Sequence, residues 1–283
     1  MGTLYVVATP IGNLDDFTKR AIDTLKSVDI ILCEDTRHSL ILLNHYDIKN
    51  KLIAYHKFNE KEKVNSIIEM LKNDKNIAII TDAGLPCVSD PGYILVEQAR
   101  LNNIEVIGVG GISASLTALS ISGLKNDSFT FYGFFPRETK DKKRLIDDIK
   151  KSDVDTFIFY ESPKRILKTL EYLKDNLGNI KICVCSDLTK LHEKSYFGNI
   201  NYVYETLLNN ENVEKGEYTF VIEKSFKEEE QKDVSTESKL VDIMIKNNVS
   251  LKEAIDILNN NDNNLSKKDI YNASLNLKDI LKK

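Results

Sequence analysis

The sequence predicts an α/β protein made of two α/β domains and a small helical appendage at the C-terminal end. Through the first 120 residues or so, short apolar runs alternate with longer amphipathic runs, which is typical of a mainly parallel sheet with helices on both faces. After residue 127, several strand-like runs follow one another closely, which favours a mixed or antiparallel sheet. From residue 237 onward only helical patterns occur.

The first domain is expected at residues 1–122. Its strands are predicted at 4–8, 30–34, 51–55, 76–82 and 104–109. The helices between them are predicted at 15–28, 40–46, 60–73, 92–103 and 113–123. Asp15 or Asp16 is the expected N-cap of the first of these helices, because a side-chain oxygen there satisfies a free backbone N–H.

The second domain is expected at residues 127–225. Its strands are predicted at 128–135, 155–162, 181–187, 194–200 and 217–224, and its helices at about 140–151 and 164–177. Residues 226–236 are charged with almost nothing apolar and are interpreted as a linker.

The appendage is expected at residues 237–283, as three short helices that resemble a helix-turn-helix bundle. Ser250 and Glu253 have the spacing of a capping box, and Ser266 with Asp269 gives a similar helix start. The charges of this part of the chain nearly balance. Because nucleic-acid modules rely on excess positive charge, a packing appendage is the favoured interpretation.

Composition indicates a globular chain for a reducing cytoplasm. Of the 283 residues, 42% are hydrophobic and 29% charged, and no apolar run reaches the length of about 20 that a membrane span needs. Cys183 and Cys185 alternate in a strand and are expected to be core residues; a metal-binding pair is the alternative, and no metal site is expected. The net charge of −4 argues against nucleic-acid binding by bulk charge alone.

Two loops directly after predicted strands are candidates for ligand binding, because ligands bind at the carboxyl ends of strands in parallel sheets. The loop from Thr9 to Leu14 contains Pro10 and Gly12, which fix a turn and permit close approach of the backbone. An ordinary strand-to-helix turn is the alternative. Residues 81–92 hold two Gly, two Pro and two Asp, a composition that favours a ligand loop, although Asp90 could simply cap the next helix.

Two further segments complete the candidate set. Residues 108–114 suit an uncharged or zwitterionic ligand held by backbone amides and by Ser113. A dinucleotide fingerprint would require glycine at that position, and no P-loop motif occurs. Glu34, Asp35 and Arg37 directly follow a strand, and they offer a general base and a guanidinium that can grip phosphate. A structural ion pair at the strand end is the alternative.

A series of motifs then links the chain to a known family. In order, they are TLYVVATPIGNLDDFT, CEDTRHS, TDAGLPCVSDPGY, GISAS, GFFPR, IFYESPKRI, LTKLHE and KGEYTFVIE. Together they resemble the tetrapyrrole methylase superfamily, and within it the branch that methylates the ribose of a cytidine in small-subunit ribosomal RNA. The resemblance implies a ligand cleft between two α/β domains, S-adenosylmethionine as the cofactor, and a homodimer that acts on 16S ribosomal RNA in the small subunit.

The resemblance also assigns residues. Cofactor contacts are implied at Ile11, Gly12, Leu85, Val88, Ser89, Ser113, Ala114, Tyr160 and Leu188. The family's Pro-Gly-Pro-Ser-Ala is replaced by residues 109–114, without either proline, so a more flexible loop is expected there. Glu34, Asp35, Arg37 and His56 are hypothesised to lie on the RNA side of the cleft, as candidates for catalysis. Arg37, Arg137 and Lys190 are the candidates for RNA binding.

Two other functions stay open at this point. A small-molecule methylase of the same fold, acting on a corrin-type ring, is favoured mildly by the low positive charge. A binding module without enzyme activity would keep the cleft alone. The CEDTRHS and IFYESPKRI motifs favour the RNA methyltransferase over the small-molecule methylase, and the intact polar loops disfavour the binding module.

Overall fold

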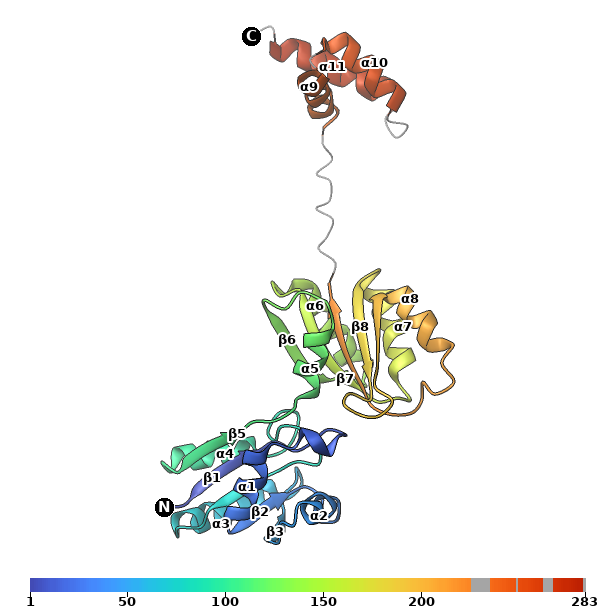
Figure 1. Ribbon diagram of the computed structural model, residues 1–283. Helices are drawn as coiled ribbons and strands as arrows, with labels where there is room; N and C mark the ends of the chain where they lie inside the picture. Colours follow the sequence, from blue (N-terminus) through green and yellow to red (C-terminus); the bar gives the residue numbers. More distant parts are fainter. Residues whose placement is uncertain (225–234, 248, 262–266, 282–283) are drawn as a thin grey trace. The chain divides into compact units, whose positions relative to one another are not determined.

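Two five-stranded sheets organise the first 224 residues of the chain (Figure 1). The computed structural model describes residues 1–224, 235–247, 249–261 and 267–281. In the first sheet the strand order is β3-β2-β4-β1-β5 and every pair is parallel, which confirms the prediction. Its strands are β1 (Thr3–Val7), β2 (Ile30–Cys33), β3 (Lys51–Ala54), β4 (Ile77–Ile79) and β5 (Glu105–Val109).

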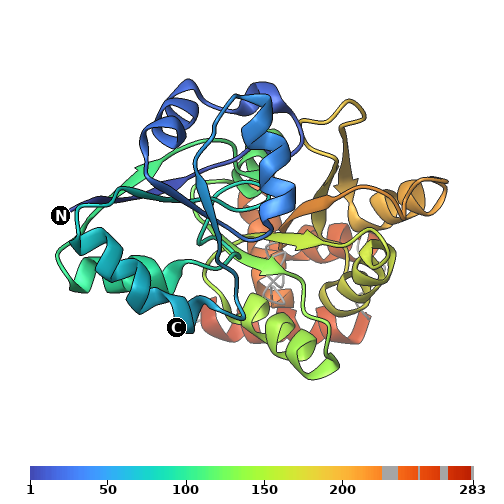
Figure 2. The ribbon, with the colours of Figure 1, turned by 90° about the horizontal axis from the view of Figure 1, so that it is seen from below.

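Helices cover both faces of the first sheet, as the apolar strands predict. Figure 2 shows α1 and α2 on one side and α3 and α4 on the other. Leu25 and Leu43 pack against Ile31 on the first side, and Ile67 and Leu95 pack with the strand residues of the second. The helices are α1 (Lys19–Ser27), α2 (Thr36–His45), α3 (Glu60–Lys72) and α4 (Tyr93–Leu101).

Two helix starts differ from the sequence prediction. Asp15 and Asp16 lie inside a short 3₁₀ helix, η1 (Leu14–Asp16). The N-cap of this helix is Asn13, whose side chain accepts a hydrogen bond from the Asp15 N–H. Thr18 caps α1 instead, accepting a hydrogen bond from the backbone of Ala21, and the prediction of an aspartate cap was wrong. Helix α2 begins four residues earlier than expected, because Asp35 caps it.

The second sheet is mixed, as predicted. Its order is β6-β7-β10-β8-β9, with β6 and β7 parallel and the other pairs antiparallel. The strands are β6 (Phe129–Phe134), β7 (Thr156–Glu161), β8 (Lys181–Ser186), β9 (Lys194–Asn199) and β10 (Tyr218–Glu223). One face packs against α6 (Thr139–Lys151), α7 (Ile166–Leu177) and α8 (Ile200–Leu208). Helix α8 is a further element that the sequence prediction lacked.

Helix α5 (Ala114–Ile121) covers the other face of the second sheet. Its Ala118 and Leu119 pack with Ile158 and with the two cysteines predicted as core residues. Cys183 and Cys185 are at most 1% exposed, and their sulfur atoms lie 3.9 Å apart, which confirms that they face the same side. By packing, α5 belongs to the second sheet, whereas the sequence placed residues 113–122 in the first domain.

The C-terminal unit has a core of its own. Compact units are found at Met1–Ser225 and Phe226–Lys283; the second contains α9 (Thr236–Asn247), α10 (Leu251–Asn261) and α11 (Lys267–Leu281). Leu240, Leu258 and Ile270 are buried in it. The capping box is confirmed, since Ser250 N–H donates to Glu253 at 2.8 Å and Glu253 N–H donates back at 3.4 Å.

Some expectations for this part of the chain fall outside the description. The linker prediction, apart from residues 235 and 236, and the predicted helix start at Ser266 lie outside the described residues. Across the described ranges, none of the helices combines the length and apolar character that a bilayer span requires.

Candidate functional site

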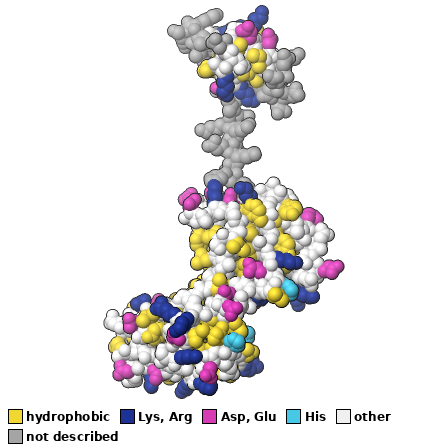
Figure 3. Space-filling view, in the orientation of Figure 1, with side chains coloured by type: hydrophobic (Ala, Val, Ile, Leu, Met, Phe, Trp, Pro, Cys, Tyr) yellow, Lys and Arg dark blue, Asp and Glu magenta, His cyan; other side chains and the backbone are white. Residues whose placement is uncertain are grey.

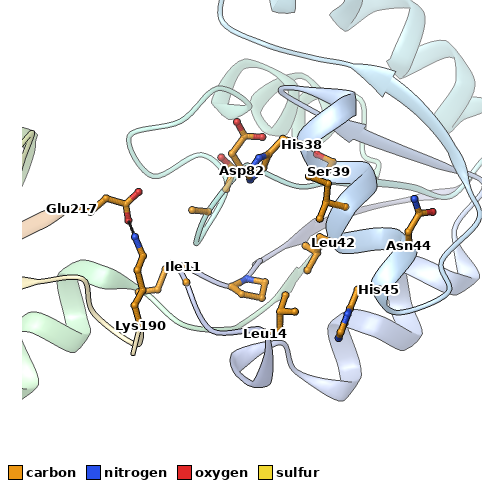
Figure 4. A pocket seen from close by; sticks show the side chains of 15 residues that line it. Ile11, Leu14, His38, Ser39, Leu42, Asn44, His45, Asp82, Lys190 and Glu217 are labelled. Atoms are coloured by element: carbon orange, nitrogen blue, oxygen red, sulfur yellow. Dashed lines mark hydrogen bonds and ion pairs between the residues drawn. The ribbon is translucent and has the colours of Figure 1, made fainter. Parts of the chain in front are cut away.

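Two neighbouring cavities lie where the first sheet ends. The central cavity has a volume of about 460 Å³ and is lined by the loops that follow strands of the first sheet and by residues of β6, β7 and β10 in the second. The α2 cavity has a volume of about 630 Å³ and lies along α2 (Figure 4). The two share part of their walls, formed by Ile11, Thr81, Asp82, Ala83 and Glu217. A ligand in one cavity would therefore lie beside a ligand in the other.

Most of the residues expected to contact a cofactor come together in the central cavity. Seven line it, namely Ile11, Leu85, Val88, Ser89, Ser113, Ala114 and Tyr160. Gly12 lines the α2 cavity instead. Leu188 is buried in the core, in the cluster against which Ile11 and Ala114 pack, so it supports this wall from behind.

The loop at residues 81–92 has an unusual backbone. Besides Gly84 and Gly92, Cys87 and Ser89 adopt positive φ angles of 68°, a left-handed conformation that costs free energy for residues other than glycine. The loop is anchored by two hydrogen bonds between the backbones of Thr9 and Gly84, at 2.9 and 3.1 Å. Such strained conformations concentrate at ligand sites. Gly92 is the N-cap of α4, so the alternative that Asp90 caps this helix was wrong.

Two glycines allow chain segments to approach closely around the cavity. A Cβ atom at Gly111 would lie 2.8 Å from the Cβ of Ala8, next to β1. A Cβ atom at Gly133 would lie 2.9 Å from the Ser89 hydroxyl, and Gly133 has a φ of 70°. Larger residues at these positions would push β5 and β6 away from the loops that line the cavity.

Five acidic residues line the central cavity: Glu34, Asp82, Asp90, Glu161 and Glu217. The first three lie in the loops that follow β2 and β4. The Thr81 hydroxyl donates a hydrogen bond of 2.6 Å to Glu34 Oε1. Burial, then the negative charge of Glu34, raises the pKa of Asp90 to about 6, although a hydrogen bond with Thr81 opposes this shift. Asp82 and Asp90 were not among the predicted site residues. The composition of the loop at residues 81–92 is the signal that could have identified them. They lie at the same end of the sheet as Glu34 because β4 and β2 are neighbouring parallel strands.

Asp35 and Arg37, the next charged residues of the CEDTRHS motif, interact with each other at the start of α2. The Asp35 carboxylate accepts hydrogen bonds from the Arg37 backbone at 2.9 Å and from its guanidinium at 2.8 Å. These hydrogen bonds hold the pKa of Asp35 well below its usual range. The ion pair expected as the structural alternative is therefore present. The Arg37 side chain is still 89% exposed, and its role in RNA binding stays a prediction.

His56 lies in the turn between β3 and α3. Asn59 fixes this turn, because its side chain accepts a hydrogen bond from the His56 N–H at 2.9 Å and lies 3.1 Å from the His56 ring nitrogen Nε2. His56 lines neither the central cavity nor the α2 cavity. The hypothesised catalytic roles of Asp35, Arg37 and His56 stay predictions.

The two remaining RNA-binding candidates differ in their surroundings. Arg137 is exposed just after β6. Lys190 lines the α2 cavity and pairs with Glu217 at 3.0 Å and with Asp187 at 3.2 Å. Partial burial lowers the pKa of Lys190, but the two carboxylates outweigh this effect and the pKa is raised. Lys190 therefore connects the loop after β8 to the residue that precedes β10.

A buried ion pair supports the wall formed by the IFYESPKRI motif. The side chain of Glu161 is 0% exposed, and it accepts hydrogen bonds from Arg165 at 3.0 Å and from the Thr169 hydroxyl at 2.6 Å. Arg165 also donates to the carbonyl of Phe135 at 2.6 Å. This network connects the end of β6 to the start of α7 and fixes the segment on which Tyr160 lies.

The chain is similar in sequence to a family of known methylases. Residues 3–203 match the family model of tetrapyrrole (corrin/porphyrin) methylases. The chain is 42% identical to ribosomal RNA small subunit methyltransferase I of Haemophilus influenzae, over 91% of both chains. It is 41% identical to the protein of that name from Bacillus subtilis, over 96% of this chain and 94% of the relative.

Solved structures share the fold at low sequence identity. Uroporphyrin-III-C-methyltransferase from Thermus thermophilus superposes with a TM-score of 0.54 at 18% identity, covering 79% of this chain and 95% of that one. Diphthine synthase superposes with a TM-score of 0.60 at 10% identity, covering 78% and 90%. These likenesses confirm the predicted architecture.

Proposed function

This chain belongs to the tetrapyrrole (corrin/porphyrin) methylase family, and on that premise we propose that it methylates small-subunit ribosomal RNA with S-adenosylmethionine. The methyl acceptor is the 2′-hydroxyl of a cytidine ribose in 16S ribosomal RNA. Relatives that are about 40% identical over more than 90% of the chain carry the name of a small-subunit ribosomal RNA methyltransferase. The observation that carries the proposal is the convergence of the implied cofactor residues on one cavity.

The residues of the central cavity fit this cofactor. When bound, S-adenosylmethionine supplies a methyl group on a positively charged sulfur. The carboxylates of Glu34, Asp82 and Asp90 provide the negative charge that attracts such a cation. Leu85 and Val88 offer apolar surface for a nucleoside. Among the titratable residues that line this cavity none is a lysine or arginine, so no side-chain cation there opposes the charge of the ligand.

The protein has two tasks in such a transfer. It must hold the acceptor oxygen in line with the methyl group, and it must receive the proton that the hydroxyl gives up. Glu34 is the one of the four catalytic candidates that lines the central cavity. Thr81 binds its Oε1, and its Oε2 accepts no hydrogen bond within residues 1–224. We assign Glu34 as the general base: the ribose oxygen gains the methyl group, and its proton passes to Glu34.

We also propose that the enzyme is a homodimer that works in the cytoplasm. Exposed apolar side chains on β6 and α5 support a protein partner there: Phe129 is 40% exposed and Leu116 is 51% exposed. Figure 3 shows apolar side chains gathered over the part of the molecule where these two elements lie. A second copy that covers this surface would remove it from water.

The proposed function is tested by offering labelled S-adenosylmethionine with three acceptors: small ribosomal subunits that lack the modification, naked 16S RNA and a tetrapyrrole. We expect label to enter the RNA of the small subunits. Transfer to the tetrapyrrole in place of RNA would establish the small-molecule alternative. Cofactor binding without transfer to any acceptor would favour a binding module.

A further inference from the structure

One face of α2 is not covered by the rest of the protein. His38, Ile41, Leu42 and His45 recur at spacings of three and four residues, so they lie on the same side of the helix. All four line the α2 cavity, and Figure 4 labels His38, Leu42 and His45 among them. Ile41 is 72% exposed, although the opposite face buries Leu43 in the core. The helix therefore presents apolar and imidazole side chains to an open cavity.

The opposite wall of the α2 cavity is held in place. It is formed by the segment after β1, including Pro10, Ile11 and Leu14. The hydroxyl of Tyr46, the C-cap residue of α2, donates a hydrogen bond of 2.6 Å to the carbonyl of Leu14. Because this bond ties η1 to the end of α2, the cavity has two fixed walls before any ligand enters.

The Asn44 amide is the hydrogen-bonding group that this cavity offers a ligand. It lines the cavity and makes no side-chain hydrogen bond within residues 1–224. The Ser39 hydroxyl is not available, because the residue is 3% exposed and its hydroxyl lies against the Cys33 thiol of β2. An amide can both donate and accept, so Asn44 suits a ligand that carries a hydrogen-bonding edge.

We propose that the α2 cavity binds the acceptor nucleotide of the RNA, with an unpaired pyrimidine base between Ile41, Leu42 and Leu14. The edge of the base pairs with Asn44, and its ribose lies at the wall shared with the central cavity. This inference rests on the proposed function, and it adds the place where the acceptor is recognised.

The position and size of the cavity select this ligand. A methyl acceptor has to come within about 3–3.5 Å of the methyl carbon, and the α2 cavity shares Thr81, Asp82 and Ala83 with the central cavity. A volume of about 630 Å³ accepts one nucleotide, and it is too small for a base-paired helix. Enzymes that read one base of RNA take it unpaired, because its edges are then accessible.

The test compares Ile41→Ala and Asn44→Ala with Leu40→Ala as the matched control. Leu40 is 44% exposed on the same helix and does not line the cavity. Binding of unmodified small ribosomal subunits is measured by filter retention, and binding of S-adenosylhomocysteine by calorimetry. We expect Ile41→Ala and Asn44→Ala each to weaken subunit binding and raise KM about tenfold. Leu40→Ala should match the wild type, and all three should bind S-adenosylhomocysteine within twofold of it.

Two results would overturn the inference, and they are distinguishable. If the wild type methylates small subunits while Ile41→Ala and Asn44→Ala behave like Leu40→Ala, the acceptor does not bind in the α2 cavity and the proposed function stands. If the wild type transfers no methyl group to small subunits, the proposed function fails and this assignment fails with it. Thermal unfolding of each variant checks that it is folded. We expect all three to fold, because the changed side chains are exposed.

Discussion

The hydroxyl of Thr81 donates a hydrogen bond of 2.6 Å to the carboxylate of Glu34, across the ends of the neighbouring parallel strands β4 and β2. The carbonyl of Thr81 also accepts a hydrogen bond of 3.1 Å from the hydroxyl of Thr9. One residue thus connects three of the loops that were singled out in the sequence. It also binds one oxygen of Glu34, while the other oxygen accepts no hydrogen bond within residues 1–224.

Glu34→Gln should reduce the rate of methyl transfer to small subunits by about 100-fold, because an amide cannot take up the proton. The size and the hydrogen bond acceptor of the side chain are kept, so S-adenosylhomocysteine should bind within twofold of the wild type. Single-turnover kinetics with unmodified subunits measures the rate. A variant as fast as the wild type would exclude Glu34 as the general base.

Thr81→Val should lower the same rate about tenfold, because it removes the hydrogen bond to Glu34 and keeps the shape of the side chain. Thr81→Ser retains the hydroxyl and should restore most of the rate. In the double variant with Glu34→Gln, the Thr81→Val change should cost little more, since both act on one interaction. Additive losses would show that Thr81 acts by another route.

Asp90→Asn should remove a pH dependence of stability. The pKa of Asp90 is about 6 in the folded chain and about 3.9 for an unfolded aspartate. Between pH about 3.9 and about 6, Asp90 is therefore protonated in the folded state and ionised in the unfolded state. The free energy of unfolding of the wild type falls as the pH rises through this range. The variant should unfold about 3 °C higher than the wild type at pH 8 and at nearly the same temperature near pH 4.

The control for Asp90 is Asp153→Asn, which changes an exposed aspartate in a loop. Thermal unfolding at both pH values should show little difference between this control and the wild type. If Asp90→Asn shifts the unfolding temperature equally at pH 4 and pH 8, the titration of Asp90 does not contribute to stability.

Arg165→Met should lower the free energy of unfolding by about 2–3 kcal/mol, because it leaves the buried Glu161 carboxylate without its cation. Lys164→Met, at the exposed neighbouring position, should change it by less than about 0.5 kcal/mol. Denaturant unfolding measures both values. Equal effects of the two substitutions would mean that the Glu161–Arg165 pair is not a structural support of the cavity wall.

Removal of residues 231–283 should leave S-adenosylhomocysteine binding within twofold of the full chain. All residues that line the central cavity lie between Ile11 and Thr219, and the helical unit has its own core. Calorimetry on the shortened and full chains compares the affinities. A loss of binding would show that the C-terminal helices complete the site.

The sequence predicted the two sheets because their strands are apolar in patterns that differ between parallel and mixed sheets. It did not predict the start of α2, because residues 36–39 are polar and the helix depends on a side-chain cap by Asp35. It also missed α8, whose aromatic and β-branched residues have strand-like preferences. Helix α5 is apolar on most sides, so its sequence did not indicate which sheet it covers.

The sequence predicted which loops form the candidate site, but it did not predict which of their side chains lie together. Glycine, proline and short polar residues after strands identified the loops that line both cavities. Which side chains converge depends on the strand order β2-β4-β1, which periodicity does not determine. For that reason Glu34 was predicted together with its sequence neighbours Asp35 and Arg37, and not with Asp82 and Asp90 in the loop after β4.

The most direct test of the central claim is the chemical position of the transferred methyl group. Small subunits that lack the modification are labelled with the enzyme and tritiated S-adenosylmethionine, and the RNA is hydrolysed with alkali. A 2′-O-methyl group blocks cleavage of the adjacent phosphodiester, because the 2′-hydroxyl is the attacking group. We predict label in one alkali-stable dinucleotide that begins with cytidine. Label in a mononucleotide, as base methylation would give, or no label in the RNA would contradict the account.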